Sequence, residues 1–396
     1  MRVLHVLHTS LPFICGYSIR SDYILRFQQQ LGLTPAVVTS AQHPNGESLQ
    51  EEIQGILYWR TPAYAGLQKP LARELGLMRL LKKRLQAAVR EFEPDLIHAH
   101  SPMLAGLPAL AVARAAGRPF VYEVRDLWEN ASVDRGKFGV NSPVYRLARR
   151  METRVLRRAD AVVTICHCLR EELAPRVGRT DRLFVVDNGV DVSGFTPDVG
   201  REEQRRRWRL EGKRIIGYVG TFQPYEGLDM LISALPQILK QEPQAHLVIT
   251  GSGGQENALR QQVCDGGLDA HVTFTGRLPH DQVAGIYALA DFMVYPRILT
   301  RTTALTTPLK PLEAMAMRKA VMVSDVKAMQ ELVRPGETGL MFRAGDVADL
   351  VAQCAGLLQE PDRQEQLGCR ARDWVLQERQ WPALVARYQE IYKVCM

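Results

Sequence analysis

Three cations and one carboxylate gather around the expected start of a helix between residues 297 and 313. Arg297, Arg301 and Lys310 surround an uncharged stretch rich in threonine, and Glu313 follows in the first turn. Cations beside a helix N-terminus form an anion site, because free amides and the helix dipole add to the point charges. A carboxylate beside that site can accept hydrogen bonds from the hydroxyls of a ribose. The spacing therefore indicates a pocket for a nucleoside diphosphate.

Charged side chains and histidines also end two expected strands. Glu123, Arg125 and Asp126 end one of them, and such groups are costly to bury unless they are paired or functional. A ligand-facing site and a salt-bridged patch at a domain interface both remain open. His98 and His100 share one face of another strand, because side chains alternate along a strand. A third ligand is not apparent in the sequence, so we expect local hydrogen bonds there and no metal ion.

Two glycine-containing loops and one pair of cysteines follow other strands. Gly16 precedes an expected helix and can let backbone amides approach a phosphate, although a plain turn fits equally well. Residues 251–254 (Gly-Ser-Gly-Gly) form a partial dinucleotide fingerprint without the acidic residue that should follow it, which favours a tight turn. The two thiols of residues 166–168 (Cys-His-Cys) are too close together for a structural zinc site.

Short apolar strands alternate with helix-length periodic segments along the whole chain, which is typical of doubly wound parallel sheets. The expected strands are 2–7, 36–39, 56–59, 96–100, 120–124, 161–165 and 183–186, then 215–219, 246–250, 272–275, 292–295 and 320–323. The expected helices are 20–31, 71–92, 104–116, 143–158, 228–239, 283–290, 312–317, 346–359, 363–380 and 383–394. Ligands of such sheets bind beyond the carboxyl ends of the strands, where the residues above lie.

A polar stretch without a strand signal, residues 198–213, interrupts this alternation and suits a linker between domains. We therefore expect an α/β fold of two doubly wound, Rossmann-like domains that face each other across a cleft. The first domain covers residues 1–197 and the second covers residues 214–378. A C-terminal helix within residues 379–396 is free to return to the first domain.

Composition excludes several classes of protein. The 396 residues are 46% hydrophobic and 23% charged, which is enough apolar material for more than one packed core and excludes a disordered chain. No apolar run approaches the roughly 20 residues of a membrane-spanning helix. Seven cysteines, an odd number scattered along the chain, indicate a reducing compartment, and we expect a cytoplasmic protein.

The net charge of +7 is concentrated in the first half, where residues 1–200 hold 26 Lys and Arg against 20 Asp and Glu. Such an excess attracts nucleic acid, an anionic membrane surface or a phosphorylated substrate. The basic and aromatic signatures of RNA-binding proteins are missing, so we expect no nucleic-acid partner. Two basic segments, 69–92 and 146–158, fit peripheral contact with anionic lipid, and they fit an ordinary solvated helix face equally well.

Several short motifs together resemble the retaining glycosyltransferases of family 4, which have the GT-B fold. They are residues 188–191 (Asn-Gly-Val-Asp) with Phe195 and Pro197, 251–253, 272–278, 290–291, 313–316 (Glu-Ala-Met-Ala), 338–340 and 345–346. Within that family, residues 10–17, 122–129, 225–229 and 307–313 resemble the exosortase-associated exopolysaccharide subgroup. The resemblance covers almost the whole chain.

The resemblance implies that a sugar moves, with retained anomeric configuration, from a nucleotide-diphosphate sugar, with UDP favoured, to a glycan or lipid-linked acceptor. The reaction needs no metal or other cofactor, serves exopolysaccharide biosynthesis, and is expected at the inner face of the membrane. The first domain is expected to hold the acceptor and the second the donor. The implied catalytic residues are Arg301, Lys310 and Arg125. The implied donor-binding residues are Gly16, Arg277, Leu278, Arg297, Thr306, Thr307, Leu309 and Glu313, and His100 and Asp126 are expected on the acceptor side.

Four positions depart from the family pattern. Leu305 stands where the first glutamate of the Glu-x7-Glu motif is expected, and Glu226 stands in place of a lysine. Arg125 replaces a frequent histidine, and Arg318 replaces a glycine where a left-handed backbone would cost a non-glycine residue roughly 1 kcal/mol. The two arginines after the strand 292–295 are candidates to supply the missing positive charge. The alternative function is a degenerate relative that binds nucleotide or glycan as a partner protein without turnover.

Overall fold

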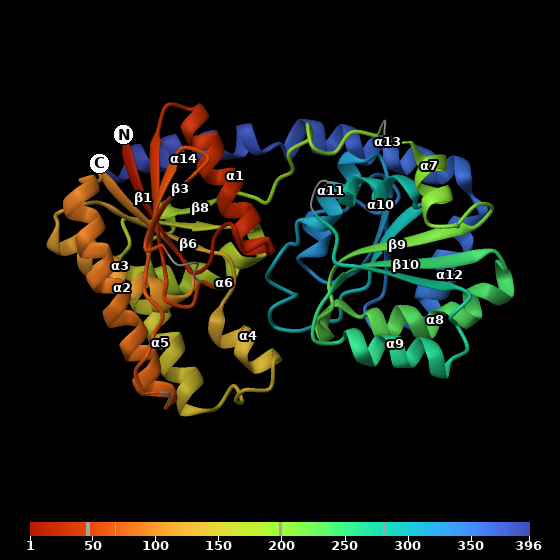
Figure 1. Ribbon diagram of the computed structural model, residues 1–396, viewed down its shortest axis with the longest axis horizontal. Helices are drawn as coiled ribbons and strands as arrows, with labels where there is room; N and C mark the ends of the chain where they lie inside the picture. The colour runs from red at the N-terminus through yellow and green to blue at the C-terminus, as the bar shows by residue number, and fades with distance from the viewer. Residues whose placement is uncertain (45–47, 68, 198–199, 280–281) are drawn as a thin grey trace. The chain divides into compact units, whose positions relative to one another are not determined.

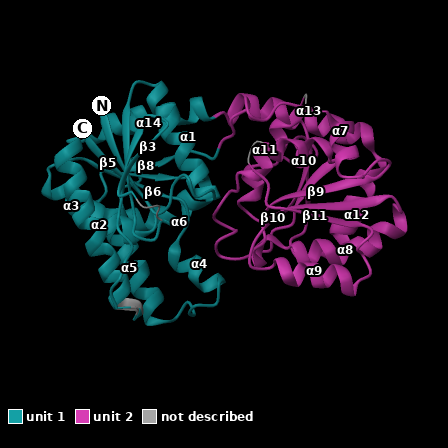
Figure 2. Cartoon of the chain, in the orientation of Figure 1, with its two compact units in different colours: residues 1–188, 381–396 teal, residues 189–380 magenta. Residues whose placement is uncertain are grey.

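The computed structural model describes residues 1–44, 48–67, 69–197, 200–279 and 282–396. The chain divides into two compact α/β units, which Figure 2 shows in different colours. Unit 1 comprises Met1–Asn188 and Trp381–Met396, and unit 2 comprises Gly189–Gln380. The first boundary therefore lies after Asn188 and not after residue 197, while the C-terminal helix belongs to the first unit.

Within the described residues, unit 1 is built on an eight-stranded sheet with the order β3-β4-β2-β1-β5-β6-β7-β8. Neighbouring strands are parallel except for β3 and β4, which pair antiparallel. The strands are β1 (Arg2–Leu7), β2 (Thr34–Thr39), β3 (Gln50–Ile53), β4 (Ile56–Arg60), β5 (Leu96–His100), β6 (Phe120–Val124), β7 (Ala161–Thr164) and β8 (Leu183–Val185). The central strands are buried along nearly their whole length because helices cover both faces of the sheet (Figure 1).

The helices of unit 1 form layers on this sheet. They are α1 (Gly16–Gln30), α2 (Pro70–Phe92), α3 (Met103–Ala115), α4 (Trp128–Asp134), α5 (Pro143–Arg158), α6 (His167–Val177) and α14 (Trp381–Cys395), with a 3-10 turn η1 (Thr180–Arg182). Helices α2, α3 and α5 pack in succession against one another, whereas α1 packs against the C-terminal α14. The two ends of the chain thus meet in one unit.

Helix α2 packs through an apolar stripe whose residues recur at intervals of three and four along the sequence. Leu81, Leu85 and Ala88 are buried, whereas Leu75 near the start of the helix is 44% exposed. The side chain of Leu71, which the sequence places on the same stripe, lies outside the described residues. The main part of α2 is therefore an ordinary core-facing helix with its basic residues on other faces.

Over its described range, unit 2 contains a six-stranded parallel sheet with the order β11-β10-β9-β12-β13-β14. The strands are β9 (Arg214–Thr221), β10 (Ala245–Ser252), β11 (Val272–Gly276), β12 (Phe292–Tyr295), β13 (Ala320–Ser324) and β14 (Leu340–Phe342). The helices are α7 (Arg201–Arg207), α8 (Leu228–Gln241), α9 (Glu256–Asp265), α10 (Val283–Leu289), α11 (Lys310–Ala316), α12 (Val347–Gln359) and α13 (Pro361–Glu378), with 3-10 turns η2 (Pro224–Glu226) and η4 (Met329–Glu331). No helix in the described part of the chain is long and apolar enough to cross a bilayer.

The stretch predicted as a linker, residues 198–213, belongs to unit 2 where the structure describes it. Helix α7 packs against α10, Nη2 of Arg205 lies 3.0 Å from Oδ2 of Asp291, and Leu210 is buried in the core. Residues 198 and 199 lie outside the described residues. The linker prediction is wrong. Most residues of this segment are polar, so nothing in the sequence indicated that Arg205 and Leu210 attach it to unit 2.

Candidate functional site

The carboxylate of Glu313 is fixed in the first turn of α11, which follows the carboxyl end of β12. Glu313 is 4% exposed, accepts a hydrogen bond from the Tyr287 hydroxyl at 2.9 Å, and lies 3.0 Å from Nζ of Lys310. The hydroxyl of Tyr295 donates to the Lys310 carbonyl at 3.0 Å, so strand β12 also holds the first residue of the helix. These contacts fix the direction in which the carboxylate can accept further hydrogen bonds.

Arg297 is committed to a buried ion pair with Glu226. Its Nη2 and Nε lie 2.8 and 3.1 Å from the two carboxylate oxygens of Glu226, and its Nη1 donates to the Thr306 carbonyl at 3.0 Å. Both charged side chains are about 10% exposed. Glu226, which stands in place of the family lysine, therefore neutralises Arg297, which the sequence suggested as a substitute for that lysine. Bidentate pairs of this kind are strong and directional.

The loop before α11 holds the remaining predicted donor residues. The Thr306 hydroxyl donates to the Thr302 carbonyl at 2.7 Å, Thr307 is buried, and Leu309 is the N-cap residue of α11. Arg301 is exposed on this loop and has no ion pair with any described residue. Arg301 is therefore a cation of the loop that no carboxylate of the described chain compensates.

The residues expected to face the base follow strand β11 directly. Arg277 is exposed, and Leu278 packs partly against the core of unit 2. Because the strands of this sheet are parallel, their carboxyl ends lie along one edge. The structure thus brings this pair to the same edge as Glu313 and the ion pair of Arg297.

In unit 1, the carboxyl ends of β5 and β6 meet at a buried ion network around Glu123. Its Oε1 lies 3.0 Å from Nε of Arg20 and 2.9 Å from Nε of Arg125, and its Oε2 accepts from the Tyr388 hydroxyl. Burial acts to raise the pKa of Glu123, but the guanidiniums of Arg20 and Arg125 outweigh it and hold that pKa well below its usual value. The carboxylate at this strand end is thus paired inside unit 1.

A series of hydrogen bonds runs in one direction through the histidines beside this network. Arginine only donates, so Nη2 of Arg125 donates to Nδ1 of His100 at 2.8 Å, which leaves the proton on Nε2. That proton is shared with Nδ1 of His5 at 3.1 Å, and Nε2 of His5 donates to Oε1 of Gln28 at 2.8 Å. The Gln28 amide then donates to the Tyr392 hydroxyl at 2.9 Å. Each of these imidazoles is therefore neutral with a defined tautomer.

The same histidines form the one candidate metal cluster among the described residues, with His5, His98 and His100 nitrogens within 4.8 Å of one another. His98 Nδ1 accepts from Tyr392 at 2.8 Å, so its Nε2 carries the proton and faces Oε2 of Glu123 at 3.6 Å. The rings of His98 and His100 are stacked with centroids 4.3 Å apart. Hydrogen bonds account for the other ring nitrogens of the three histidines, and the absence of a metal ion stays a prediction.

Arg125 and His100 support this edge through contacts inside unit 1. Nη1 of Arg125 donates to the Tyr17 carbonyl at 2.7 Å and to Oγ of Ser21 at 2.9 Å, and its guanidinium carbon lies 4.2 Å from the centre of the Tyr17 ring. His100 is fully buried. These contacts give both residues a positioning role, and a direct contact of either with a substrate stays a prediction.

Gly16 and Asp126 flank the same edge. Gly16 begins α1, and a Cβ atom there would meet nothing within 4 Å in the described chain, so the fold itself does not require a glycine. Asp126 follows β6, and burial raises its pKa, with Arg135 as the main opposing charge. The small residue at the start of α1 is thus compatible with a ligand that approaches closely.

Several residues of these networks were missed from the sequence. His5 carried a signal, because a polar residue interrupts the apolar run of β1. Arg20 and Gln28 lie on the expected first helix, and nothing in its periodicity distinguishes them. Tyr388 and Tyr392 come from the other end of the chain, so only the tertiary structure brings them to β5 and β6.

Comparison with known proteins supports the resemblance found in the sequence. Residues 16–189 match the glycosyl transferase 4-like domain, and residues 213–360 match the glycosyl transferases of group 1. The chain is therefore similar to glycosyltransferases in both of its units. It is 30% identical over 253 residues to the GDP-mannose-dependent alpha-(1-6)-phosphatidylinositol monomannoside mannosyltransferase of Mycolicibacterium smegmatis, a match that covers 63% of this chain and 65% of that one. It is 28% identical to a GDP-mannose-dependent alpha-mannosyltransferase of the same organism, over 99% of this chain and 98% of that one.

Solved structures agree on the fold of this chain. Sucrose-phosphate synthase from Thermosynechococcus elongatus is similar with a TM-score of 0.81 and 21% identity, covering 99% of this chain and 98% of that one. Anabaena HepE in complex with UDP gives a TM-score of 0.75 at 18% identity, covering 99% of this chain and all of that one. The GT-B fold expected from the sequence is thereby confirmed.

Proposed function

We propose that the chain is a retaining glycosyltransferase that transfers a sugar from a nucleotide-diphosphate sugar, with UDP favoured, to a glycan or lipid-linked acceptor in exopolysaccharide biosynthesis. We infer that it acts in the cytoplasm at the inner face of the membrane, without a metal or other cofactor. The observation that carries the proposal is the carboxylate of Glu313, held by Tyr287 and Lys310 at the carboxyl edge of unit 2. A fixed acceptor at that edge suits the hydroxyls of a nucleotide ribose.

The main catalytic requirement of such a transfer is to stabilise the negative charge that develops on the leaving diphosphate. The Lys310 ammonium has three N–H donors and lies beside Glu313, so it can also reach a phosphate oxygen. Arg301 is exposed on the preceding loop without a carboxylate among the described residues. Cations that are already in place stabilise the charge that develops as the glycosidic bond breaks. We assign this role to Lys310 and Arg301.

A binding protein without turnover is the second candidate, and a specific observation favours it. Leu305 stands in the place of a family glutamate, and Arg297, which could replace the family lysine, is neutralised by Glu226. These two changes remove charge from the side of the site where the sugar and phosphates are expected. Turnover therefore has to be measured separately from nucleotide binding.

The identity of the nucleotide base is tested by comparing the binding of donor sugars that carry different bases. The named relatives are GDP-mannose-dependent, whereas HepE is described in complex with UDP, and our own expectation is UDP. Metal-free calorimetric titration with UDP-, GDP- and ADP-sugars should show binding of one class. Glu313→Ala should weaken that binding by at least about tenfold, because hydrogen bonds to a charged group contribute about 1.5–3 kcal/mol. Glu337→Ala, which removes an exposed carboxylate paired with Arg334, is the matched control.

The outcomes separate the two candidates. Binding that Glu313→Ala weakens, together with release of nucleoside diphosphate in the presence of acceptor membranes, supports the transferase. Binding without release supports the partner protein. No binding of any donor by the folded protein contradicts the transferase and favours a partner protein that binds glycan.

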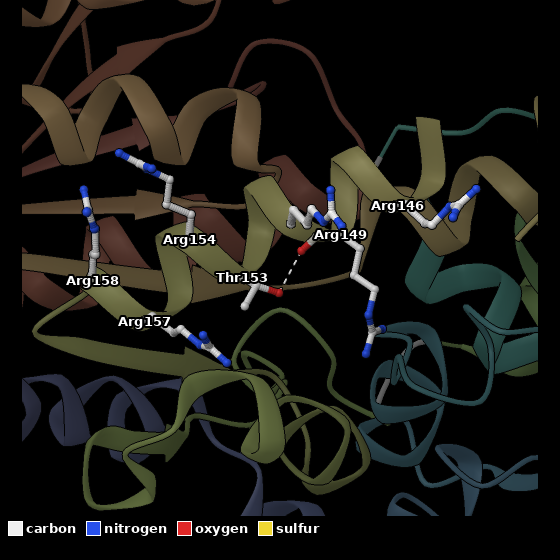
Figure 3. A pocket seen from close by; sticks show the side chains of 7 residues that line it. Arg146, Arg149, Thr153, Arg154, Arg157 and Arg158 are labelled. Atoms are coloured by element: carbon white, nitrogen blue, oxygen red, sulfur yellow. Dashed lines mark hydrogen bonds between the residues drawn. The ribbon is translucent and has the colours of Figure 1, made fainter. Parts of the chain in front are cut away.

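Contact with an anionic membrane is part of the proposal, and α5 is the element that supports it. Figure 3 shows guanidinium groups spread along this helix around a hollow. Among described residues the hollow is lined by Arg146, Arg149, Arg150, Thr153, Arg154, Arg157 and Arg158. Val144 and Leu147 are 51% and 47% exposed at the start of the same helix. Exposed apolar side chains beside arginines suit the boundary between lipid headgroups and acyl chains.

A further inference from the structure

We propose that Arg20 is a positioning residue that anchors both chain segments connecting the two units and links them to the start of helix α1. The expected effect of Arg20 on kcat rests on the proposed transfer reaction. The expected effect on the distribution of distances between the units does not. Arg20 is 2% exposed, and its guanidinium reaches three separate parts of unit 1, namely β6, residues 186–188 and α14.

The first connecting segment leaves unit 1 after Asn188, and Arg20 binds its last three residues. Nη2 donates to the Val186 carbonyl at 2.8 Å. Nη1 donates to the Asp187 carbonyl at 3.0 Å and to Oδ1 of Asn188 at 3.0 Å. Three acceptors on consecutive residues fix both the position and the direction of the chain as it leaves the unit.

The second connecting segment re-enters unit 1 at Trp381, the first residue of α14, and Arg20 contacts this helix too. The guanidinium carbon lies 5.4 Å from the centre of the fully buried Trp381 ring. Nη2 lies 3.4 Å from the Tyr388 hydroxyl, which in turn donates to Glu123. One side chain therefore holds both crossings on the side of unit 1.

On the side of unit 2 the two segments are bonded directly to each other. The amide of Val190 donates to the Arg379 carbonyl at 2.9 Å, and Val190 pairs with Gln380 in an isolated bridge. The two crossings between the units thus lie between residues 188 and 189 and between residues 380 and 381, with hydrogen-bonded residues on both sides. Loss of the Arg20 contacts would release them on the side of unit 1 only.

Arg20 also connects the crossings with the loop that begins α1. It lies one helical turn after Gly16 and shares the Glu123 carboxylate with Arg125. Arg125 binds the Tyr17 carbonyl at 2.7 Å, so a displacement at the start of α1 also displaces a guanidinium that is paired with the same carboxylate. The geometry connects a loop expected to face substrate with the two segments that join the units.

Stability alone does not account for this arrangement. Replacing a buried ion pair by apolar residues of similar volume is often neutral or stabilising, so an apolar side chain could fill this space. It could not bind three consecutive acceptors. Lysine could keep a charge beside Glu123, but its single ammonium lacks the planar fork that reaches two carbonyls and an amide at once.

The test compares Arg20→Lys with Arg26→Lys on the same helix, where Arg26 pairs with Asp22 at 3.1 Å near the surface. Genetically encoded fluorophores replace Ala116 in unit 1 and Gln241 in unit 2, both exposed. In the ligand-free full chain, Arg20→Lys should broaden the distribution of inter-fluorophore distances, and the control should match the wild type. An unchanged distribution in folded Arg20→Lys overturns the proposal. If that variant does not fold, Asn188→Ala takes its place, and a wild-type distribution there overturns the proposal equally.

Kinetics separate positioning from a loss of the binding site. Affinity for UDP and GDP should stay within about twofold of the wild type, because the residues assigned to the nucleotide lie in unit 2 except for Gly16, which Arg20→Lys leaves unchanged. The kcat should fall by about tenfold or more, since misplacement by ~1 Å is enough to cost 10²-fold. An equal loss of nucleotide affinity contradicts positioning. The ligand-free distances do not depend on transfer activity, so failure of this inference and failure of the proposed function give different results.

Discussion

At the scale of single residues, the buried histidines of unit 1 are held uncharged. Burial and the neighbouring His100 lower the pKa of His5 to about 3, and burial and Arg125 lower that of His100 to about 4. The series of hydrogen bonds from Arg125 to Tyr392 also requires neutral imidazoles, because a doubly protonated ring could not accept a hydrogen bond. We therefore expect a fall in pH to destabilise this cluster of histidines before other parts of unit 1.

We expect unit 1 to lose stability as the pH falls from about 6.5 towards 4. The unfolded histidines bind protons in this window and the folded ones do not, so the free energy of unfolding falls by about 1.4 kcal/mol per pH unit for each such histidine. Glu152, whose pKa burial raises to about 8, acts in the opposite direction and is common to all variants. Hydrogen exchange of β1 and β5 at several pH values measures the slope.

His5→Asn should reduce that slope by the share of one histidine, whatever it does to stability at neutral pH. His167→Gln, which replaces an exposed histidine outside this series of hydrogen bonds, is the matched control. Equal slopes for His5→Asn and the wild type would show that this imidazole is not held neutral.

The residues of the site were predictable where their partners lie nearby in the sequence. Lys310 and Glu313 are three residues apart, and their contact follows from helix geometry. The partner of Arg297 was not predictable, because Glu226 arrives from the end of a neighbouring strand. The same holds for Glu123, whose partners come from α1 and α14.

At the scale of elements, the approach of α13 to the end of α11 depends on a glycine. A Cβ atom at Gly368 would lie 2.2 Å from the carbonyl oxygen of Arg318, a backbone atom that cannot rotate away. Arg318 itself has a φ of +57°, the left-handed conformation expected from the sequence, so its carbonyl direction is constrained. The two elements can approach this closely only without a side chain at residue 368.

Gly368→Ala should therefore destabilise unit 2 by about 1–3 kcal/mol, as overpacking does in well-packed regions. Gly356→Ala is the matched control in α12, where a Cβ atom would meet nothing within 4 Å in the described chain. That substitution should be neutral or stabilise by up to about 1 kcal/mol, because alanine favours a helix interior. Urea denaturation gives both values, and similar effects of the two substitutions would contradict the close approach.

The arginines of α5 give a second prediction at this scale. Arg150→Glu with Arg154→Glu should weaken binding to vesicles containing anionic phosphatidylglycerol by at least about tenfold, because each basic residue near such a surface contributes about 1 kcal/mol. The control, Arg363→Glu with Arg370→Glu, changes the net charge equally on α13 of unit 2. Vesicle sedimentation at fixed ionic strength measures both. An equal loss in both variants would assign the effect to net charge and not to α5.

Most long elements follow from sequence periodicity, although α6 and α9 were missed, and several of the other missed elements have a physical reason. Helix α4 has seven residues, and β3 and β14 have four and three, too few for a periodic pattern to develop. Helix α7 is polar along most of its length, because it anchors through the Arg205 ion pair and not through an apolar stripe. Short or polar elements depend on tertiary contacts that a local pattern does not contain.

At the scale of the whole molecule, unit 1 is completed by the last residues of the chain. Helix α14 inserts Trp381, Leu384, Val385, Tyr388, Ile391 and Tyr392 as buried side chains. It packs against α1, β6 and β7, which belong to the first half of the sequence. The sequence leaves this return open, since an apolar periodic helix at the C-terminus can pack on either domain.

A chain that ends at Gln380 should therefore fail to fold unit 1 while unit 2 stays folded. Burial of each large apolar side chain contributes about 1.5–3 kcal/mol, so losing six of them removes as much as the 5–15 kcal/mol that typically separates folded from unfolded states. A chain that ends at Lys393 removes the exposed Val394 and Met396 and should behave as the full chain. Hydrogen exchange should show unprotected β1 and β5 beside protected β9 and β12 in the first truncation only. Protected β1 and β5 there would mean that unit 1 is complete without α14, and the Arg20 contacts to this helix would then be dispensable for its folding.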